Sequence, residues 1–303
     1  NTTINKYAYC TLTPRSDRNM NINSLYYGQY QAPLDGGPLP LNNNMSLISS
    51  VTNYFQVKHG FDMVIRSDVP AGSGLGGSST MIVSMISAMV NWLDVDMTKE
   101  DMARLAYHLE REVIGLKGGL QDQYAAVYGG FNSLVIHGHN VKVEPANITP
   151  DIVDELQCRS VLCYTGISRD SATIINTQIK SYRQGRNDEA LDVSKELAKK
   201  IRNTLRYGDI EGTGRLLDQV WQYKKQFSDK VTNPEIDGLY QIAMSHGAIG
   251  GKVSGAGGGG FMYFICRYDK KGELTKALAD AGAIISDFNF EPVGVKSWRS
   301  RNE

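Results

Sequence analysis

The chain has 303 residues, and its 32 Lys and Arg residues balance its 32 Asp and Glu residues. This length is enough for one large or two medium domains, each with a buried core. The neutral balance argues against a nucleic-acid-binding protein, which normally carries a basic stripe. No apolar run approaches the roughly 20 residues that span a membrane. The four cysteines form no C-x-x-C pair, so we expect reduced, mostly packed thiols in a cytoplasmic protein.

The first half of the chain is predicted to mix strands with helices. Strands are expected at 5–13, 21–30 and 61–65, and helices at 45–59, 81–86 and 98–113. The strand at 61–65 is predicted because its apolar residues alternate with polar ones. The last helix begins at Thr98, whose hydroxyl precedes an acidic residue as in a capping box, and Gly115 ends it.

The second half is predicted to be mainly helical up to about residue 246. A strand is expected at 156–164, a helix begins at Asn233-Pro234-Glu235 as cap, proline and acid, and the chain finishes with a strand at 261–266, a helix at 270–281 and a strand at 284–290. A polar stretch before residue 156 predicts a boundary between domains 1–155 and 156–303. The irregular mixture favours an α+β fold over a doubly wound sheet.

The stretch Pro70-Ala71-Gly72-Ser73-Gly74-Leu75-Gly76-Gly77-Ser78-Ser79-Thr80 lies between a predicted strand and a predicted helix. Successive glycines let backbone N–H groups approach a ligand, and the helix that follows offers a partial positive charge. Together these features predict an anion site that suits a nucleotide phosphate. The hydroxyls of Ser78 and Ser79 are placed to reach a phosphate or its Mg²⁺.

Other interpretations of this loop remain open. It is not a Walker A loop, because no Lys follows the last glycine before Ser or Thr. It satisfies G-x-G-x-x-G at Gly72, Gly74 and Gly77, but a dinucleotide site also needs a second strand ending in an acid. Asp94 and Asp96 lie near the required distance, yet a helix runs into them. A tight packing turn without a ligand is the remaining alternative.

The segment from Glu110 to Tyr124 contains three carboxylates, and a flexible Gly-Gly turn separates Glu110 and Glu112 from Asp122. Phosphoryl transfer needs a metal ligand and a residue that orients the attacking hydroxyl, and Glu110 and Asp122 are candidates for these tasks. Alternatively, Glu110 is a solvated helix charge paired with Arg111 or Lys117, and Asp122 caps the next segment. Lys117 is a candidate phosphate contact or a surface residue.

A second glycine-rich loop, Ser254-Gly255-Ala256-Gly257-Gly258-Gly259-Gly260, separates a helical region from a strand. Apolar structure on both sides argues against a flexible linker.

These three segments, in this order, resemble the motifs of the GHMP kinases over essentially the whole chain. The resemblance implies a two-domain fold with a ribosomal-S5-domain-2-like N-terminal domain and a ferredoxin-like C-terminal domain.

The resemblance also implies roles for individual residues. The ATP phosphates would contact Gly72, Ser73, Gly74, Leu75, Gly76, Gly77, Ser78 and Ser79. Ser78 and Glu110 would hold Mg²⁺, and Asp122 would be the catalytic base. Many relatives have Ser where this chain has Gly77, so Ser79 is a secondary candidate metal ligand. Gly257 and Gly258 would approach the substrate.

The family carries an earlier motif that supplies sugar contacts and a basic partner for the catalytic Asp, and no residues here match it. Because residues 7–12 already resemble a strand, we expect the chain to begin just after that motif, without its first strand. The resemblance then leaves the activity of this form open.

Two segments have sequences most similar to those of the heptose 7-phosphate kinases in this family. They are Glu110–Tyr124 and Tyr164-Thr165-Gly166-Ile167-Ser168-Arg169. That similarity implies a small-molecule sugar phosphate as partner, a 1,7-bisphosphate product on the way to nucleotide-activated heptose, and a monomer or homodimer. Arg169 would bind the substrate phosphate and Thr165 the sugar, although a surface salt bridge remains an alternative for Arg169. Rival functions are another sugar 1-kinase of the fucokinase or galactokinase type, a catalytically silent nucleotide- or sugar-binding homologue, and a dehydrogenase.

Overall fold

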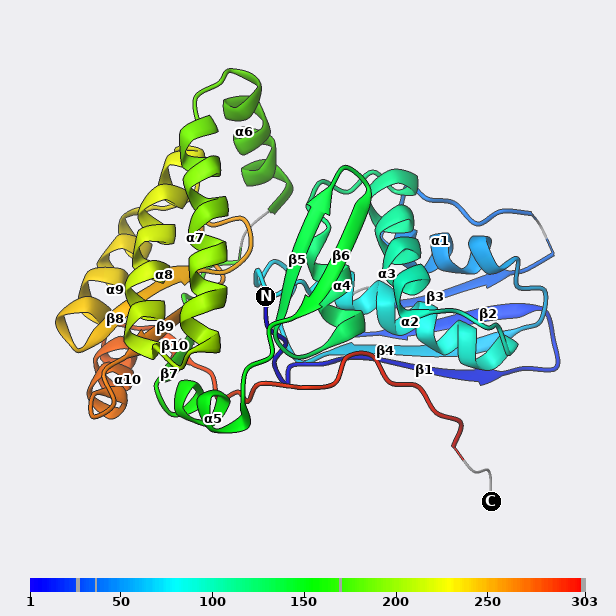
Figure 1. Ribbon diagram of the computed structural model, residues 1–303. Helices are drawn as coiled ribbons and strands as arrows, with labels where there is room; N and C mark the ends of the chain where they lie inside the picture. Colours follow the sequence, from blue (N-terminus) through cyan, green and yellow to red (C-terminus); the bar gives the residue numbers. More distant parts are fainter. Residues whose placement is uncertain (26–27, 36, 169–170, 301–303) are drawn as a thin grey trace. The chain divides into compact units, whose positions relative to one another are not determined.

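The computed structural model describes residues 1–25, 28–35, 37–168 and 171–300 and contains two compact units (Figure 1). The first comprises Asn1–Ala71, Gly76–Gly130 and Glu291–Glu303, and the second comprises Gly72–Leu75 and Phe131–Phe290. The expected boundary at 155/156 falls inside the second unit. Phe131 belongs there because its ring lies 4.9 Å from that of Phe290 and packs on a cluster around Leu156.

The first unit contains a four-stranded sheet. Its strands are β1 (Ala8–Pro14), β2 (Asn19–Ser24), β3 (Gly28–Pro33) and β4 (Phe61–Ser67), in the spatial order β1-β4-β2-β3. β2 and β4 are parallel, and the other pairs are antiparallel. The prediction of one strand at 21–30 is wrong, because the chain folds back and Ser24 pairs with Gly28.

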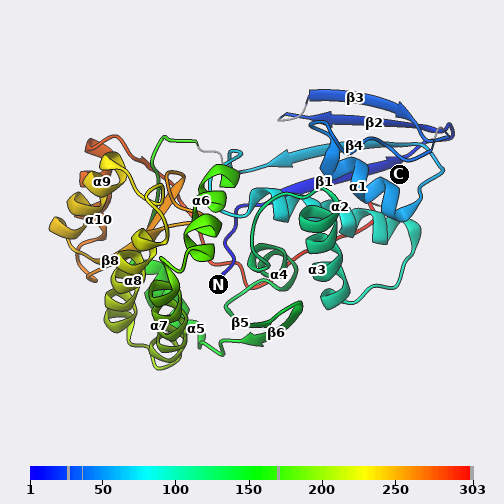
Figure 2. The ribbon, with the colours of Figure 1, turned by 90° about the horizontal axis from the view of Figure 1, so that it is seen from above.

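Helices cover one face of this sheet (Figure 2). They are α1 (Ser46–Phe55), α2 (Gly77–Leu93), α3 (Lys99–Tyr107), the π-helix η1 (His108–Val113) and α4 (Gln121–Tyr128). α2 packs on β1 and β4, and α3 and α4 pack on α2. The alternation predicted for β4 is confirmed, since Phe61, Met63 and Ile65 are all buried. The cap of α3 is confirmed too, because the Thr98 side chain accepts a hydrogen bond from the N–H of Asp101.

The second unit begins with a hairpin and continues with a helix-covered sheet. Its elements are β5 (Asn132–His137), β6 (Asn140–Pro145), α5 (Pro150–Cys158), β7 (Ser160–Tyr164), α6 (Ser171–Arg183), α7 (Asp188–Arg206), α8 (Ile210–Lys224), η2 (Lys225–Phe227), α9 (Pro234–Ser245), β8 (Ala248–Val253), β9 (Phe261–Cys266), α10 (Lys271–Asp280) and β10 (Ile284–Ile285). The main sheet is antiparallel with the order β10-β7-β9-β8. This order is the ferredoxin-like arrangement expected for the C-terminal half.

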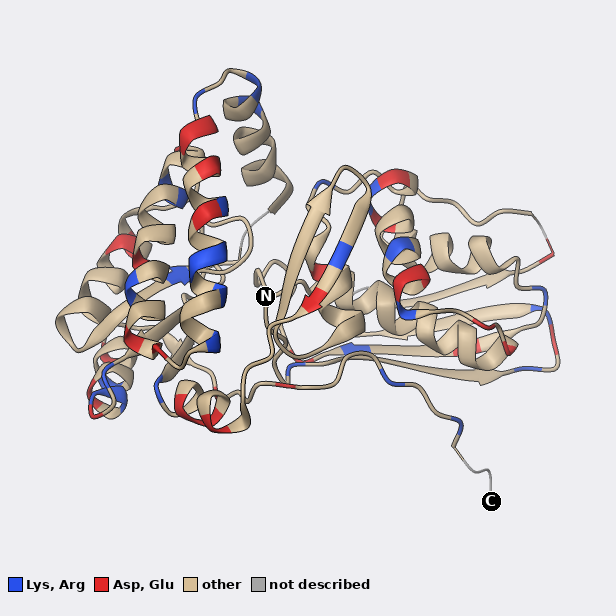
Figure 3. Cartoon of the chain, viewed as in Figure 1, with Lys and Arg blue, Asp and Glu red and all other residues tan. Residues whose placement is uncertain are grey.

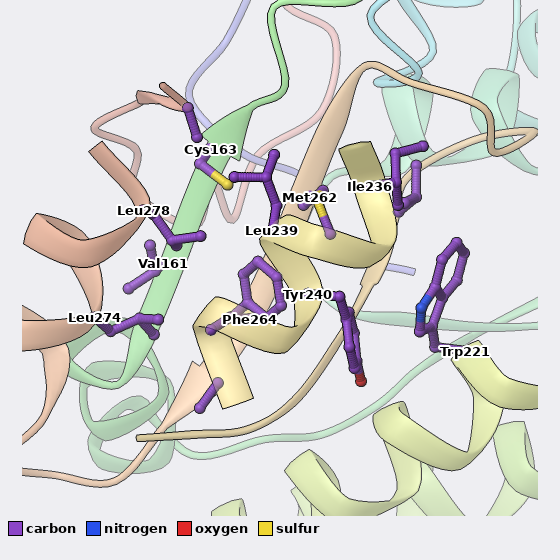
Figure 4. Packing of buried hydrophobic residues seen from close by; sticks show 14 of the residues in the cluster. Val161, Cys163, Trp221, Ile236, Leu239, Tyr240, Met262, Phe264, Leu274 and Leu278 are labelled. Carbon is purple, nitrogen blue, oxygen red and sulfur yellow. The ribbon is translucent and has the colours of Figure 1, made fainter. Parts of the chain in front are cut away.

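A core cluster of the second unit lies between this sheet and α9 and α10, and Trp221 of α8 belongs to it (Figure 4). Three of its aromatic rings are in series: the ring centroids of Trp221 and Tyr240 are 6.1 Å apart, and those of Tyr240 and Phe264 are 5.7 Å apart. Such large side chains contribute most to burial of apolar surface. The predicted start of α9 is confirmed, because the Asn233 side chain accepts a hydrogen bond from the N–H of Ile236.

The cysteines are all free, but only half of them are packed in the core. Cys163 and Cys266 are buried, Cys10 is half-buried and Cys158 is exposed. Burial raises the pKa of the Cys163 thiol to about 12, so this thiol is not a reactive thiolate at neutral pH.

Charged residues of both signs are interspersed along α3 in the first unit and along α7 in the second (Figure 3). α7 begins with Asp188 and Glu189 and ends with Arg206, which matches the polarity of the helix dipole. Within the described part of the chain, no helix combines the length and the apolar character that crossing a bilayer requires.

Candidate active site

The first glycine loop joins β4 to α2. Gly72, Gly74 and Gly76 have φ values of 73°, 83° and 71°, a region that residues with a side chain rarely adopt. Gly76 immediately precedes α2, whose first N–H groups lack partners within the helix. The N-terminus of α2 thus offers backbone donors of the kind that bind anions.

Ser79, in the first turn of α2, is hydrogen-bonded to Glu110. The Glu110 side chain is fully buried, and its Oε2 accepts a hydrogen bond of 2.7 Å from the Ser79 hydroxyl. The structure therefore pairs Ser79, rather than Ser78, with Glu110. Because α2 begins at Gly77, Ser79 is the third residue of the helix and is buried. Ser78 is the second residue and is exposed.

Gln123 supplies the second partner of Glu110. Its Nε2 donates to Oε2 of Glu110 over 2.6 Å, and its side chain is fully buried. Gln123 lies on α4, one residue after Asp122, on the face that also buries Tyr124 and Val127. Buried amides are normally bound to a specific partner, and here the partner is the carboxylate.

Arg111 is the cation nearest to this carboxylate among the described ion pairs. Its Nη1 lies 3.4 Å from Oε1 of Glu110, and only 12% of the Arg111 side chain is exposed. The guanidinium also donates to the Ser79 hydroxyl and to the Lys117 carbonyl, each over 3.3 Å. Gly118 makes room for it, since a Cβ there would lie 2.5 Å from Cζ of Arg111.

A π-helical turn positions Glu110. The predicted helix at 98–113 is α-helical only as far as Tyr107, and η1 continues it with wider turns, closed by a hydrogen bond of 3.1 Å from the N–H of Ile114 to the carbonyl of Leu109. Both Leu109 and Glu110 are buried. π-turns inside helices occur frequently at functional sites, and this one turns the carboxylate toward α2 and α4.

Asp122 lies against the first glycine loop. It is in the first turn of α4, where the helix dipole favours a negative charge. A Cβ at Gly76 would lie 3.1 Å from both Cβ and Cγ of Asp122. The carboxylate therefore stands next to the predicted phosphate loop, as a residue that orients a nucleophile must.

The chemistry of this cluster fits a divalent cation that is shared with a phosphorylated ligand. Oε1 of Glu110 is buried and has no hydrogen-bond partner. In the part of the chain that the structure describes, no group of three or more His, Cys, Asp or Glu side chains is arranged so that it could hold a metal ion. Mg²⁺ commonly uses one or two carboxylates together with substrate phosphates, so Glu110 and an adjacent serine hydroxyl suit it.

The second glycine loop is held by side chains of neighbouring helices. Lys224 donates to the carbonyls of Val253 and Gly255, and Gln178 donates to that of Ala256 over 2.7 Å. Gly257 and Gly258 pack closely, since a Cβ would lie 2.6 Å from the Val231 carbonyl oxygen at Gly257 and 2.5 Å from Cδ1 of Ile174 at Gly258.

Two observations limit how the second loop contacts a ligand. The N–H of Gly258 donates to the carbonyl of Val231 over 2.6 Å, so this group is not available to a substrate. The Thr165 hydroxyl donates to the carbonyl of Gly260 over 3.0 Å. Arg169, the predicted phosphate contact, lies outside the described residues.

The two glycine loops touch within the second unit. Ser73 is buried, and its carbonyl accepts a hydrogen bond of 2.9 Å from the N–H of Phe261. A Cβ at Gly260 would overlap the Ser73 carbonyl oxygen. Glycine at 260 is therefore required by the approach of the other loop.

The structure thus brings Ser79, Glu110 and Asp122 together with the loop at Gly76. Sequence reasoning missed Gln123, which it assigned no role, and it treated Arg111 only as a surface partner of Glu110. The apolar spacing of Leu120, Tyr124 and Val127 places Gln123 on the same helix face, and this was the available signal.

Comparison with known proteins agrees with this architecture. Residues 45–130 match the family description "GHMP kinases N terminal domain", and residues 195–284 match "GHMP kinases C terminal". A D-glycero-alpha-D-manno-heptose 7-phosphate kinase of Campylobacter jejuni is 38% identical over 99% of this chain and 90% of its own length.

Solved structures give the same result. A D-glycero-D-manno-heptose 1-phosphate kinase from Bacteroides thetaiotaomicron superposes with a TM-score of 0.80 at 30% identity, covering 99% of this chain and 90% of that one. A Lactococcus lactis galactokinase, at 17% identity, shares the fold with a TM-score of 0.76 over 97% of this chain and 87% of that one. The sequence identity, the order of strands and the carboxylates behind the glycine loop agree: this chain belongs to the GHMP kinase family.

Proposed function

We propose that this protein is a cytoplasmic kinase that transfers the γ-phosphoryl group of ATP to the anomeric hydroxyl of D-glycero-D-manno-heptose 7-phosphate, giving the 1,7-bisphosphate and ADP. The single observation that carries the catalytic part is the buried Glu110, with one oxygen held and one without a hydrogen-bond partner. The substrate is supported by the heptose 7-phosphate kinase that is 38% identical over 99% of the chain.

In this proposal, residues 72–79 contact the ATP phosphates. The positive φ values of Gly72, Gly74 and Gly76 let backbone N–H groups turn toward one ligand. Lysine is absent from the loop, so backbone donors and the helix N-terminus replace the charge that a Walker A lysine would supply.

Glu110 and a hydroxyl of Ser78 or Ser79 would hold Mg²⁺. When bound, Mg²⁺ neutralises charge on the phosphate oxygens during transfer. Ser79 is the stronger candidate for the hydroxyl, because it already bonds to Glu110. Ser78 is exposed one residue earlier in α2.

Asp122 would orient the sugar hydroxyl and take its proton. The hydroxyl oxygen forms a bond to the γ-phosphorus, the bond from that phosphorus to the bridging oxygen of ADP breaks, and the proton passes to the Asp122 carboxylate. The electron pair of the broken bond stays with ADP. The position of Asp122 beside Gly76 supports this role.

The experiment measures ADP release from Mg-ATP with a panel of acceptors. Heptose 7-phosphate is compared with heptose 1-phosphate, unphosphorylated heptose, fucose, galactose and mevalonate. Heptose 1-phosphate belongs in the panel because the names of the two heptose kinase relatives differ in the position of the phosphate. We expect turnover with heptose 7-phosphate alone, and phosphorus NMR of the product should show a new anomeric phosphate.

The other outcomes separate the rival functions. Turnover with a neutral sugar would keep the kinase and reject the phosphorylated substrate. Turnover with heptose 1-phosphate alone would reject the anomeric hydroxyl as acceptor. ATP binding without turnover on any acceptor would favour a catalytically silent homologue.

A further inference from the structure

We propose that Arg111 is a displaceable counter-ion of Glu110, which occupies the metal-binding side of the carboxylate until a divalent cation replaces it. In this arrangement Ser79 and Gln123 are the positioning residues that keep the carboxylate fixed during the exchange. The inference rests on the proposed role of Glu110 as a metal ligand, and it assigns Arg111 a competition with the metal.

The two oxygens of the Glu110 carboxylate are held differently. Oε2 accepts two short hydrogen bonds, of 2.7 Å from Ser79 and 2.6 Å from Gln123. Both donors are neutral and buried. Oε1 has no hydrogen-bond partner. The carboxylate is therefore anchored by hydrogen bonds through one oxygen, whereas the other oxygen has only the ion pair with Arg111.

Arg111 is held more loosely than these neutral donors. Its contacts to Oε1 of Glu110, to Ser79 and to the Lys117 carbonyl measure 3.4, 3.3 and 3.3 Å. Its Nε is buried without a partner. Charge-assisted hydrogen bonds that are fully formed are nearer 2.7–2.9 Å, so the guanidinium balances the charge of Glu110 without being locked to it.

A third atom of the cluster lacks a hydrogen-bond partner. Oε1 of Gln123 is buried and unsatisfied, as are Oε1 of Glu110 and Nε of Arg111. Native proteins leave few buried polar atoms unpaired, and those that remain mark catalytic roles or sites of ordered water and ions. Three such atoms in one cluster indicate that the cluster is built to take up something polar.

Electrostatics then require an exchange. A fully buried carboxylate without a nearby cation is strongly unfavourable, so Arg111 is needed while the site holds no metal. A divalent cation at the same oxygen makes the guanidinium redundant and repels it. The free energy that holds Arg111 against Glu110 is therefore subtracted from the metal affinity, as linkage requires.

This hypothesis and a purely structural role for Arg111 predict opposite changes in metal affinity when Arg111 is removed. If Arg111 only tied η1 to the Lys117 carbonyl, its removal would loosen Glu110 and weaken metal binding. If Arg111 competes with the metal, its removal strengthens metal binding, even though the metal-free protein becomes less stable. The sign of the change in affinity therefore decides between the two roles.

The test titrates Mn²⁺ into the protein without nucleotide or sugar and follows free Mn²⁺ by EPR. The proteins are wild type, Arg111→Gln, Glu110→Gln and the matched control Arg104→Gln. Arg104 pairs with Glu100 at 3.9 Å on the neighbouring α3, with 58% of its side chain exposed, so its removal should leave the affinity unchanged. We expect Arg111→Gln to bind Mn²⁺ at least about fivefold more tightly than wild type, the lower end of typical coupling between sites.

The outcomes separate this inference from the proposed function. An unchanged affinity in Glu110→Gln would reject the metal site itself. Loss of binding in Glu110→Gln, with equal, weaker or undetectable binding in Arg111→Gln, would keep the metal site and overturn the counter-ion role.

A second variant guards against a failure of Arg111→Gln to fold. Arg111→Lys keeps a charge but loses the fork that reaches both Ser79 and Lys117, so its Mn²⁺ affinity should lie between those of wild type and the neutral variant. Binding by Arg111→Lys that is no tighter than that of wild type would also overturn the proposal.

Discussion

Asp122 and Gly76 form a contact in which each residue restricts the other. Gly76 has a φ of 71°, and a Cβ there would lie 3.1 Å from Cγ of Asp122. The carboxylate thus takes its place from the backbone of the loop as well as from the first turn of α4. Disturbing either residue should affect catalysis before it affects the fold.

Replacing Asp122 with Asn should abolish proton transfer while leaving nucleotide binding intact. General-base catalysis contributes about 10²–10⁴-fold, so kcat in the ADP-release assay should fall by at least about 100-fold. The Kd for ATP, measured by calorimetry, should change less than about twofold. Asp96→Asn, at an exposed position after α2, is the control. Normal turnover by Asp122→Asn would remove Asp122 from the mechanism.

Replacing Gly76 with Ala should lower kcat by about tenfold or more, because the new methyl group displaces Asp122. Gly282→Ala is the matched control, since Gly282 has a φ of 91° but nothing within 4 Å of its Cβ position. Both variants carry the backbone cost of a left-handed alanine, about 1–2 kcal/mol. Equal kcat values for the two variants would show that the contact with Asp122 does not matter.

Sequence singled out the carboxylates of the candidate site, but not their partners. The resemblance to GHMP kinase motifs pointed to Glu110 and Asp122, and their roles as metal ligand and base stay predictions. The choice between Ser78 and Ser79 depends on the residue at which α2 begins, and each residue along a helix rotates by about 100°. Gln123 was missed because the apolar spacing of α4 indicates only that its side chain is buried, and not that a carboxylate lies beside it.

At the scale of elements, local patterns succeeded where one face of an element is buried. The alternation of β4 and the caps of α3 and α9 were predicted correctly. The hairpin of β2 and β3 was read as one strand, because Leu25-Tyr26-Tyr27, between the two arms, are apolar or aromatic residues rather than turn-forming ones. The π-turn at 108–113 was invisible, since it preserves an apolar helical pattern while changing the direction of Glu110.

Lys224 should act as a clamp on the second glycine loop. It lies at the end of α8, is only 8% exposed, and donates to the carbonyls of Val253 and Gly255. Lys224→Met keeps the length of the side chain and removes the donor, leaving carbonyls without this partner. We expect a loss of about 1–3 kcal/mol in the free energy of unfolding and faster hydrogen exchange at residues 253–260.

The control for this clamp is Lys199→Met. Lys199 is 63% exposed and pairs with Glu196 on α7, and exposed pairs of this kind contribute little. In Lys199→Met, hydrogen exchange at residues 253–260 should be as slow as in wild type. If Lys224→Met also left the exchange of residues 253–260 unchanged, the loop would be held by Gln178 and the packing of its glycines instead.

At the scale of the whole molecule, the chain leaves the first unit and returns to it. Residues 291–300 follow the second unit in sequence but belong to the first. The N–H of Gly130 donates to the carbonyl of Glu291, and the N–H of Glu291 donates to that of Thr3, each over 2.8 Å. This C-terminal segment therefore ties the end of α4 to the start of the chain.

Within this segment, Gly294 is the position at which we expect an added side chain to be least tolerated. A Cβ at Gly294 would overlap the carbonyl oxygen of Val127, near the end of α4, and backbone atoms cannot move aside as a flexible side chain does. Gly294→Ala should therefore lower the free energy of unfolding of the first unit by about 1–3 kcal/mol, as overpacking does. Hydrogen exchange should become faster in α4 and remain unchanged in β7 and β9.

Gly272→Ala provides the comparison for Gly294→Ala. Gly272 lies in the first turn of α10 with nothing within 4 Å of its Cβ position, and alanine is the better helix former by up to about 1 kcal/mol. This variant should be as stable as wild type or slightly more stable. Because α4 carries both Asp122 and Gln123, a shift of its end in Gly294→Ala should also reduce kcat. Full stability and activity in Gly294→Ala would mean that residues 291–300 lie on the first unit without holding α4 in place.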